Sequence, residues 1–235
     1  MTAVSTSTIA SFHLIRYGSA GAMKHMAFDR PLLRRAGGLL FWRLLGTGRG
    51  RTMSLGADLR RWALFAVWRG EGDLEEFLRA SPIAARWRAE ACEAWHVRLA
   101  PVSSRGAWSG RDPFDGLAAR RGGGDGGPVA VLTRASIRPG RLLAFYRSVP
   151  EVDELLRRQD GCLASIGMGE WPLARQATFS LWRDHEAVRA FAYRGRAHRR
   201  VIERVRAHDW YAEELFARFI PYASEGTWEG VDPLR

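Results

Sequence analysis

The sequence predicts an α+β fold in which two tandem ferredoxin-like repeats form a single-chain dimeric α+β barrel. Three observations lead to this fold class: the two halves are similar in sequence, a Gly-rich segment lies between them, and each half has the same order of strand and helix signals. A split βαβ unit carries its helices on one face of its sheet and leaves the other face apolar. Two such units are expected to pack sheet against sheet around an apolar space.

The internal similarity is clearest near the end of each half. Residues 98–113 read RLAPVSSRGAWSGRDP and residues 218–233 read RFIPYASEGTWEGVDP, with eight of sixteen residues identical. Random pairing gives roughly one identity at ordinary residue usage. Upstream, FAVWR at 65–69 matches FSLWR at 179–183. The stretch AARRGGGDGG at 118–127 is the predicted linker.

These matches divide the chain into an N-terminal repeat, a linker and a C-terminal repeat. The predicted bounds are 9–116, 117–127 and 128–235. The C-terminal repeat is expected to carry the functional site, for the reasons given below.

Each repeat shows the element order βαββαβ. A strand ending in arginine opens each one, at 12–16 and 130–134, and a helical segment follows. Gly-x-Gly segments at 46–48 and 167–169 are read as turns, because no complete dinucleotide-binding motif surrounds them. A strand (62–68 or 176–182), a helix and a last strand (95–100 or 216–222) complete the repeat. Ser81 and Pro82 form a helix-start signal in the first repeat.

The charge and cysteine content limit the partners. The chain of 235 residues has a net charge of +11, and Lys24 is its one lysine. The arginines are scattered among acidic residues without a dense basic run, so no nucleic-acid partner is expected. An acidic protein partner fits this charge. Cys92 and Cys162 have no metal or redox spacing, which favours a reducing cytoplasm.

No targeting or membrane-spanning segment is expected. The first residues lack the pattern of a signal peptide. The longest apolar stretch, 39–45, is interrupted by Arg43 and is far shorter than the ~20 residues that span a bilayer. We expect a cytoplasmic protein, and contact with a membrane surface and assembly into a homo-oligomer both stay open.

Several motifs resemble those of the spheroidene monooxygenase family of carotenoid biosynthesis. They are FAVW at 65–68, LTRAS at 132–136, IGMGEWP at 166–172, QATFSLW at 176–182, the pattern H-x-x-x-I-x-x-V-R-x-x-x-W at 198–210, and EL-x-ARF at 214–219. The resemblance covers most of the chain. It implies a haem b oxygenase that inserts oxygen into an unactivated carbon of a long apolar polyene, with electrons from a ferredoxin.

His198 is the candidate axial ligand of the haem iron and therefore the candidate metal-binding residue. It is the polar member of an apolar helical stripe that comprises Val188, Phe191, Gly195, His198, Ile202 and Val205. The repeat places Ala84 at the corresponding position, so the scaffold does not require this imidazole. Gly195, one turn earlier, would leave room for a flat macrocycle, and a glycine that serves only a helix break is the alternative. A core histidine that bonds a backbone carbonyl is the alternative.

Arg134 and Gln176 are the candidate catalytic residues. Arg134 shares a strand face with Ala130 and Leu132, and Arg16 is its expected counterpart in the first repeat. An arginine near the barrel interior would pair with a haem propionate or stabilise iron-bound oxygen. A solvated strand end is the alternative. Gln176, expected on a strand facing the same space, is the weaker distal candidate.

Three functions remain open at this point. The first is a haem-dependent monooxygenase acting on an apolar, carotenoid-like or other natural-product substrate held between the sheets. The second is a haem lyase or dehydratase of the aldoxime dehydratase kind, which consumes no external electrons. The third is a haem-free barrel that binds an apolar ligand. Because one repeat has a histidine where the other has Ala84, the haem hypotheses predict one haem per chain.

Overall fold

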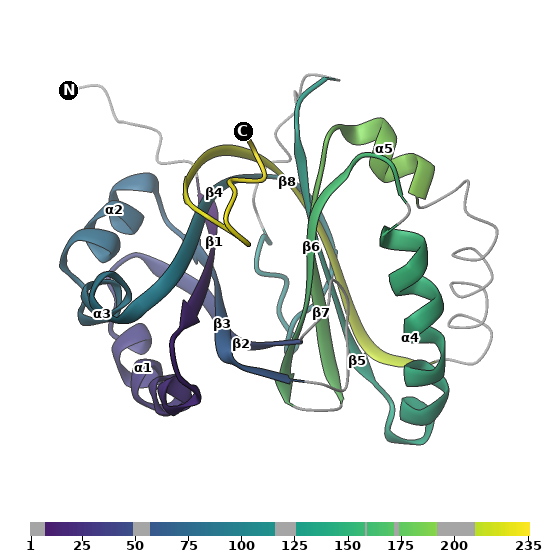
Figure 1. Ribbon diagram of the computed structural model, residues 1–235, viewed down its shortest axis with the longest axis horizontal. Coiled ribbons are helices and arrows are strands. Elements are labelled where there is room, and N and C mark those ends of the chain that lie inside the picture. The colour runs from purple at the N-terminus through teal and green to yellow at the C-terminus, as the bar shows by residue number, and fades with distance from the viewer. Residues whose placement is uncertain (1–7, 49–56, 116–125, 158, 172–173, 192–209) are drawn as a thin grey trace.

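The computed structural model describes residues 8–48, 57–115, 126–157, 159–171, 174–191 and 210–235, in which the order βαββαβ occurs twice (Figure 1). The first unit comprises β1 (Ile9–Tyr17), α1 (His25–Arg34), β2 (Leu39–Gly48), β3 (Ala57–Trp68), α2 (Glu71–Ala80), α3 (Pro82–Glu90) and β4 (Ala91–Gly106). The second comprises β5 (Val129–Ile137), α4 (Leu142–Arg157), β6 (Cys162–Trp171), β7 (Arg175–Trp182), α5 (His185–Arg189) and β8 (Tyr211–Gly226). Short 3-10 turns, η1 (Ala20–Lys24) and η2 (Pro139–Arg141), precede α1 and α4.

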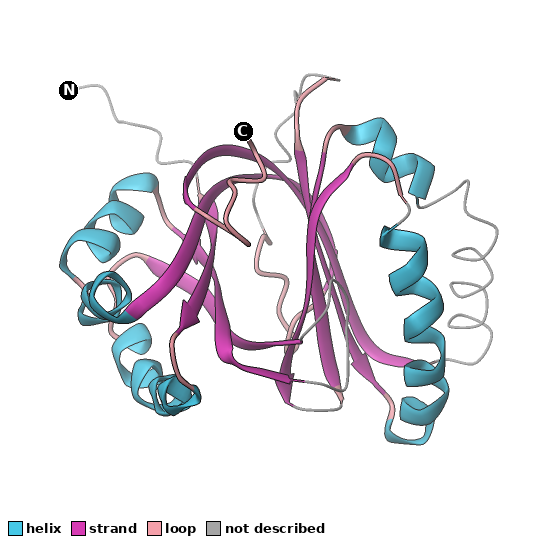
Figure 2. Cartoon of the chain, in the orientation of Figure 1, coloured by secondary structure: helices cyan, strands magenta, loops and turns pink. Residues whose placement is uncertain are grey.

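The strands form one closed antiparallel barrel in the order β1-β3-β2-β6-β7-β5-β8-β4. Each unit contributes a sheet of ferredoxin-like order, β4-β1-β3-β2 and β8-β5-β7-β6. A long β4–β8 ladder and a short β2–β6 ladder join the two sheets. The helices lie outside the barrel, with α1, α2 and α3 over the first unit and α4 and α5 over the second (Figure 2). These features confirm the predicted fold class.

None of the helices in the described ranges has both the length and the apolar character needed to cross a membrane.

Side chains fill the barrel interior. Phe12 of β1 and Phe179 of β7, from opposite walls, stack with their ring centroids 4.1 Å apart and their planes 11° apart. Phe65 of β3 stacks on Trp108 at 6.0 Å. All four residues are completely buried. The prediction of an apolar space between the two sheets is therefore wrong for the described residues. Their inward side chains pack against one another, as in other small barrels.

The repeated segments after β4 and β8 make the same contacts in both units. Gly106 and Gly226 have φ angles of +91° and +85°. A Cβ on either glycine would lie 2.1 or 2.0 Å from a carbonyl oxygen of the other unit. Asp112 and Asp232 each accept a hydrogen bond from a serine hydroxyl eight residues earlier and from a backbone N–H two residues later. These segments are therefore similar in structure as well as in sequence.

The ladders correct the expected counterpart of Arg134. Arg134 pairs with Ala177, and Leu14 pairs with Ala63, the residue that corresponds to Ala177. Arg134 therefore corresponds to Leu14, and the expectation that Arg16 is its counterpart is wrong by two residues. A shift of two residues keeps every side chain on the same face of the strand, so the apolar pattern alone does not distinguish the two registers.

The two Gly-x-Gly segments lie within strands β2 and β6, so their interpretation as turns is wrong. Gly46 and Gly169 pair with each other in the short ladder between the units. A Cβ on Gly46 would lie 3.5 Å from the Trp62 ring and 3.8 Å from the Gly169 carbonyl oxygen. These are ordinary van der Waals distances, so the space at this position does not itself require glycine.

Candidate functional site

Arg134 and Gln176 lie on adjacent strands but on opposite faces of the sheet. Arg134 continues the inward face of β5, and its side chain is 2% exposed. Gln176 pairs with Ala135, the next residue of β5, and its side chain contacts α4 outside the barrel. Successive residues of a strand point to opposite faces. The expectation that Arg134 and Gln176 face the same space is therefore wrong.

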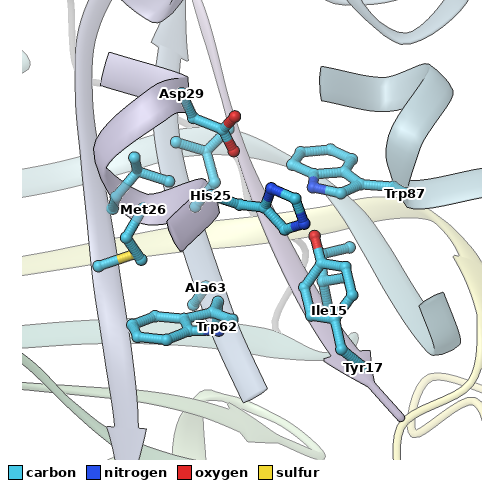
Figure 3. A pocket seen from close by; sticks show the side chains of 10 residues that line it. Ile15, Tyr17, His25, Met26, Asp29, Trp62, Ala63 and Trp87 are labelled. Carbon is cyan, nitrogen blue, oxygen red and sulfur yellow. The ribbon is translucent and has the colours of Figure 1, made fainter. Parts of the chain in front are cut away.

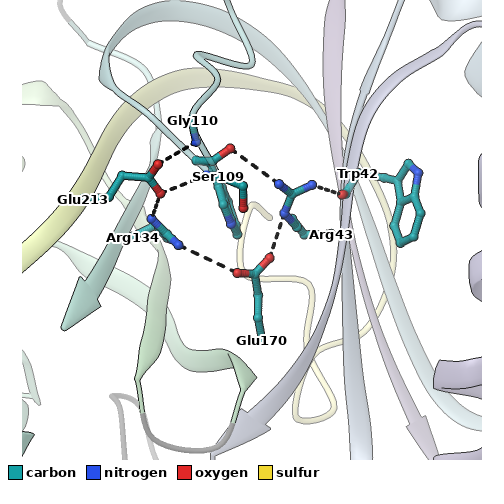
Figure 4. Close-up of polar contacts among 8 residues, drawn as sticks. Trp42, Arg43, Ser109, Gly110, Arg134, Glu170 and Glu213 are labelled. Atoms are coloured by element: carbon teal, nitrogen blue, oxygen red, sulfur yellow. Dashed lines mark hydrogen bonds and ion pairs between the residues drawn. The ribbon is translucent and has the colours of Figure 1, made fainter. Parts of the chain in front are cut away.

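Arg134 belongs to an ionic network inside one end of the barrel (Figure 4). Its guanidinium contacts the carboxylate of Glu213 from β8 and lies 3.9 Å from Glu170 of β6. Glu170 also pairs with Arg43 of β2, with 2.7 Å between Nε and Oε1. Backbone N–H groups at 109–110 donate to Glu213 at 2.8 and 2.6 Å. The network links strands of both units to the segment that follows β4.

The charges of this network compensate one another. Burial alone would raise the pKa of Glu213, but hydrogen bonds from Gly110 and Ser109 and the charge of Arg134 hold it below its usual value. The Nε of Arg134 is buried and has no hydrogen-bond partner. Arg134 is thus an interior ion-pair residue, and the alternative of a solvated strand end is wrong.

Gln176 connects β7 to α4. Its Nε2 donates a hydrogen bond to the Tyr146 hydroxyl at 2.8 Å, and the residue is 5% exposed. Burial raises the pKa of Tyr146, although the bond from Gln176 opposes this shift. The phenol is therefore neutral at physiological pH, and the pair places an amide on the helix-facing side of the second sheet.

The helix-facing side of the second sheet consists largely of small residues. Cross-strand pairing places Thr133 of β5 beside Thr178 of β7, and Thr178 beside Gly167 of β6. The next row contains Ala135, Gln176 and Gly169 in the same strand order. In the central part of this face, Gln176 alone among these residues extends a long side chain toward the helices, and it contacts Tyr146 of α4.

The first sheet carries larger residues at the corresponding positions. Six helix-facing positions are larger in the first unit than in the second. The pairs, first unit before second, are His13 and Thr133, Ile15 and Ala135, Trp42 and Ser165, Leu44 and Gly167, Trp62 and Gln176, and Leu64 and Thr178. Equivalent positions thus carry large side chains on the helix-facing side of the first sheet and smaller ones on that of the second. We call the second surface, formed by Thr133, Ala135, Ser165, Gly167, Gln176 and Thr178, the low face.

In the first unit, the space between sheet and helices is largely filled. A single cluster of buried residues spans it, and a small pocket remains between α1, α3 and the sheet (Figure 3). Tyr17, His25 and Trp87 line this pocket, beside Asp29, which pairs with Arg86. Ala84 is 2% exposed and belongs to the same cluster.

The predicted helix start at Ser81 is confirmed. Its hydroxyl accepts a hydrogen bond from the Ala84 N–H at 3.0 Å, and Pro82 is the first helical residue. Asp184 caps α5 in the same way, accepting from the Ala187 N–H at 2.7 Å. The two helix starts are not equivalent, since Asp184 corresponds to Gly70, which precedes α2 without a side-chain cap.

The candidate haem-binding residues His198 and Gly195 lie in residues 192–209, outside the described part of the chain. The two ends of this segment are described. Val188 of α5 packs in a cluster with Val131, and Trp210 packs in a cluster with Ile137. Both contacts are on the helix-facing side of β5, on either side of Thr133 and Ala135.

The low face fits a flat macrocycle such as haem. A planar ligand between a sheet and its helices needs a floor without large side chains, and Thr133, Thr178 and Gly167 supply one. Haem iron also needs an axial side chain, usually histidine, cysteine, tyrosine or methionine. Residues 192–209 contain three residues of these types, Tyr193, His198 and His208, and among them His198 belongs to the apolar helical stripe of the sequence.

A buried histidine pair in the first unit was not predicted from the sequence. The Nδ1 atoms of His13 and His96 are 2.9 Å apart, and His13 Nε2 lies 2.8 Å from the Ser11 hydroxyl. Burial lowers the pKa of both imidazoles, that of His13 most strongly. The described residues contain no cluster of three or more potential metal ligands. The pair therefore acts as a neutral hydrogen-bonded unit in the core.

Comparison with solved structures supports the fold. An aldoxime dehydratase in complex with butyraldoxime has a TM-score of 0.67 at 9% identity, over 99% of this chain and 85% of that one. A second aldoxime dehydratase structure has a TM-score of 0.62 at 13% identity, over 94% and 83%. At these identities the likeness concerns the fold alone. A comparison with models of known protein families finds no match.

Comparison with curated proteins finds relatives over nearly the whole chain. Spheroidene monooxygenase of Rhodobacter capsulatus is 35% identical over 230 residues, which cover 96% of this chain and 95% of the relative. Spheroidene monooxygenase of Rubrivivax gelatinosus is 37% identical over 193 residues, 82% of this chain and 73% of the relative. Identity at this level over most of both chains establishes descent from a common ancestor, and the chain belongs to the spheroidene monooxygenase family.

Proposed function

We propose that this chain is a haem b-dependent monooxygenase that inserts oxygen into a long apolar polyene of the carotenoid type. Membership of the spheroidene monooxygenase family supports the reaction and the substrate class. The cofactor proposal rests on one observation above all: the second sheet has small residues where the first has bulky ones. The smaller side chains of the described part of the second sheet support a ligand site on this side of it.

His198 would hold the haem iron, and Gly195 would leave room for the macrocycle. When bound, haem would supply the activation of dioxygen. Gln176 would supply a polar group to the bound ligand, since its amide lies on the low face and its Nε2 donates to the Tyr146 hydroxyl. Its carbonyl oxygen is a hydrogen-bond acceptor that can orient a proton donor.

The apolar surroundings are expected to keep water away from the reacting carbon. Val131, Trp182 and Phe216 border the low face, and the first two are almost completely buried. An apolar wall favours a polyene over a polar substrate and limits access of water. The substrate is therefore expected against the low face and not in the barrel interior, which is filled by side chains.

The reaction needs an electron donor, and an acidic ferredoxin is the proposed partner. The net charge of +11 favours association with an acidic protein through long-range attraction. Because this attraction is screened by salt, the rate of reduction by ferredoxin should fall as ionic strength rises.

Reconstitution with haem tests the cofactor proposal. Wild-type protein should show a shifted Soret band and one haem per chain, and His198→Ala should lose most of that shift. Gly167→Leu with Thr178→Leu restores the residues of the first unit on the low face, and this double variant should also lose haem while it remains folded. Gly140→Leu is the control, because a Cβ at Gly140 meets nothing within 4 Å.

Two results would contradict the proposed function. A wild-type protein that remains colourless with ample haem would refute the cofactor. Turnover without dioxygen and without net consumption of reductant would instead indicate a lyase or dehydratase. Measuring oxygen and reductant consumption against product formation separates this second case from a monooxygenase.

A further inference from the structure

Both units have an arginine at one equivalent position, but the charges of the residues around it differ. Arg98 of β4 and Arg218 of β8 occupy equivalent positions, since they pair with the equivalent residues Ser11 and Val131. In the first unit, Arg98 forms ion pairs with Glu71 and Glu75 of α2, at 3.1 Å for Glu75. These carboxylates compensate the charge of Arg98.

The second unit has no carboxylate at either corresponding position. His185 and Arg189 of α5 replace the two glutamates, and like them they are four residues apart on one helix face. Within the described ranges, the contacts of the Arg218 side chain are to His185 and to the Ser103 hydroxyl, at 2.6 and 2.9 Å. Neither group is an anion that would compensate the guanidinium charge.

A third position shows the same reversal. Glu225 pairs with His96 in the β4–β8 ladder, and the equivalent partner of Phe216 is Arg105. The Arg105 guanidinium carbon lies 5.5 Å from the centre of the Phe216 ring. Three acidic residues around the first sheet, Glu71, Glu75 and Glu225, thus correspond to His185, Arg189 and Arg105 around the second, with Glu225 and Arg105 each supplied by the strand of the other unit. We call the group formed by Arg105, His185, Arg189 and Arg218 the basic edge.

The basic edge borders the low face. Arg218 pairs with Val131, and Val131 pairs with Ser180, so these three residues form the row next to Phe216, Thr133 and Thr178. A ligand lying on the low face therefore has the guanidinium of Arg218 at one side. Arginine presents several fixed N–H donors and suits carboxylate recognition.

His185 positions Arg218 without neutralising it. A guanidinium has no acceptor, so its NH1 donates to His185 Nε2, and the neutral ring then carries its proton on Nδ1. Glu71 positions Arg98 in the first unit but also cancels its charge. The exchange of glutamate for histidine keeps the orientation of the arginine and leaves its charge available to a ligand.

We propose that the basic edge binds the carboxylate groups of the haem that lies on the low face, with Arg218 as the principal donor. This inference rests on the proposed function. An acidic protein partner is the competing occupant, but the fixed contacts of Arg218 and its position beside a ligand-sized floor favour a small bound carboxylate. Arg105 and Arg189 are exposed and would add attraction at the rim.

Binding of haem and of haem dimethyl ester, which lacks free carboxylates, tests the inference. Wild-type protein should bind haem roughly tenfold more tightly than the ester, the size expected for one lost charge-assisted hydrogen bond. Arg218→Gln should weaken haem binding about tenfold and leave the ester almost unaffected. Arg98→Gln, the matched change in the first unit, should alter neither affinity.

A second variant keeps the inference testable if Arg218→Gln does not fold. His185→Glu with Arg189→Glu installs the carboxylates of the first unit, which should pair with Arg218, preserve folding and weaken haem binding by a similar factor. Equal affinities for haem and ester in wild-type and variant proteins would overturn the inference and leave the proposed function intact. So would an unchanged haem affinity combined with a raised KM for reduced ferredoxin, which would assign the basic edge to the electron donor. A wild-type protein that binds neither porphyrin would refute the proposed function and this inference together.

Discussion

Replacing Arg134 with leucine separates a structural role for this residue from a role at the haem. Leucine occupies the equivalent position in the first unit, as Leu14, so the barrel accepts its shape. Removing one partner of a buried ion pair costs about 3–5 kcal/mol. Glu213 keeps two backbone N–H donors and Glu170 keeps Arg43, which reduces the loss. We expect Arg134→Leu to lower the free energy of unfolding by about 2–3 kcal/mol.

Urea denaturation followed by tryptophan fluorescence measures this loss, and thermal unfolding gives a second estimate. For a chain of this size, a loss of 2–3 kcal/mol corresponds to a fall in Tm of roughly 4–12 °C. Arg16→Leu is the control, since Arg16 lies at the end of β1 outside the network and should change stability by less than about 0.5 kcal/mol. The second variant Arg134→Leu with Glu213→Gln should recover part of the loss, because no uncompensated carboxylate remains.

The pH dependence gives an independent check. The folded-state pKa of Glu213 is lowered, so its contribution to stability is fully present above its unfolded pKa and is lost as pH falls through its folded pKa. Without Arg134 this lowering is smaller, and the difference between wild type and Arg134→Leu should narrow in acid. A variant as stable as wild type at pH 7 would contradict the structural role of Arg134. If that variant also lost haem, Arg134 would act at the ligand and not in the barrel.

Three further predictions concern the first unit. Burial lowers the pKa of His13, so stability should fall as pH drops below about 6.5, where the unfolded chain takes up protons, and His13→Thr should flatten this fall in urea midpoints. Ala84→His should cost roughly 1–3 kcal/mol by overpacking and leave the haem content at one per chain in a pyridine haemochrome assay; recovery of a second haem would indicate a vestigial pocket. Gly106→Ala should destabilise by more than about 3 kcal/mol, because its Cβ would lie 2.1 Å from the Glu214 carbonyl oxygen, whereas Gly110→Ala, with a positive φ but open space, should cost about 1–2 kcal/mol.

The sequence predicted the order of the elements and the contacts after the last strand of each unit, because both depend on local signals that occur twice. Ser81 and Pro82 mark a helix start by their own chemistry, and the identical residues of 98–113 and 218–233 need the same surroundings. Because the unit is duplicated, the fold class could be predicted from a single sequence. Where a repeat was matched by a short apolar run alone, as at Arg16 and Arg134, the register was wrong by two residues.

The sequence did not predict on which face Gln176 lies. A strand with one face in water shows its orientation by alternating apolar and polar residues. In β7 both faces are buried, one by the barrel interior at Phe179 and the other by helices at Trp182, so alternation is lost. The pair of His13 and His96 was missed for another reason, since its members are 83 positions apart and meet through strand pairing.

The proposed roles of the low face and of the basic edge both follow from comparing equivalent residues of the two units. Residues that are the same in both units serve the shared scaffold, as Gly106 and Gly226 do through their positive φ angles. Residues that differ at equivalent positions are free of that requirement. Several of these differences lie on one side of one sheet: large side chains are replaced by small ones on the low face, negative charge is exchanged for positive at its border, and a histidine stands in the sequence where the first unit has Ala84. The exchange of Leu14 for Arg134 lies inside the barrel and serves the ion pairs there. The proposed anionic macrocycle would account for the first group of changes together.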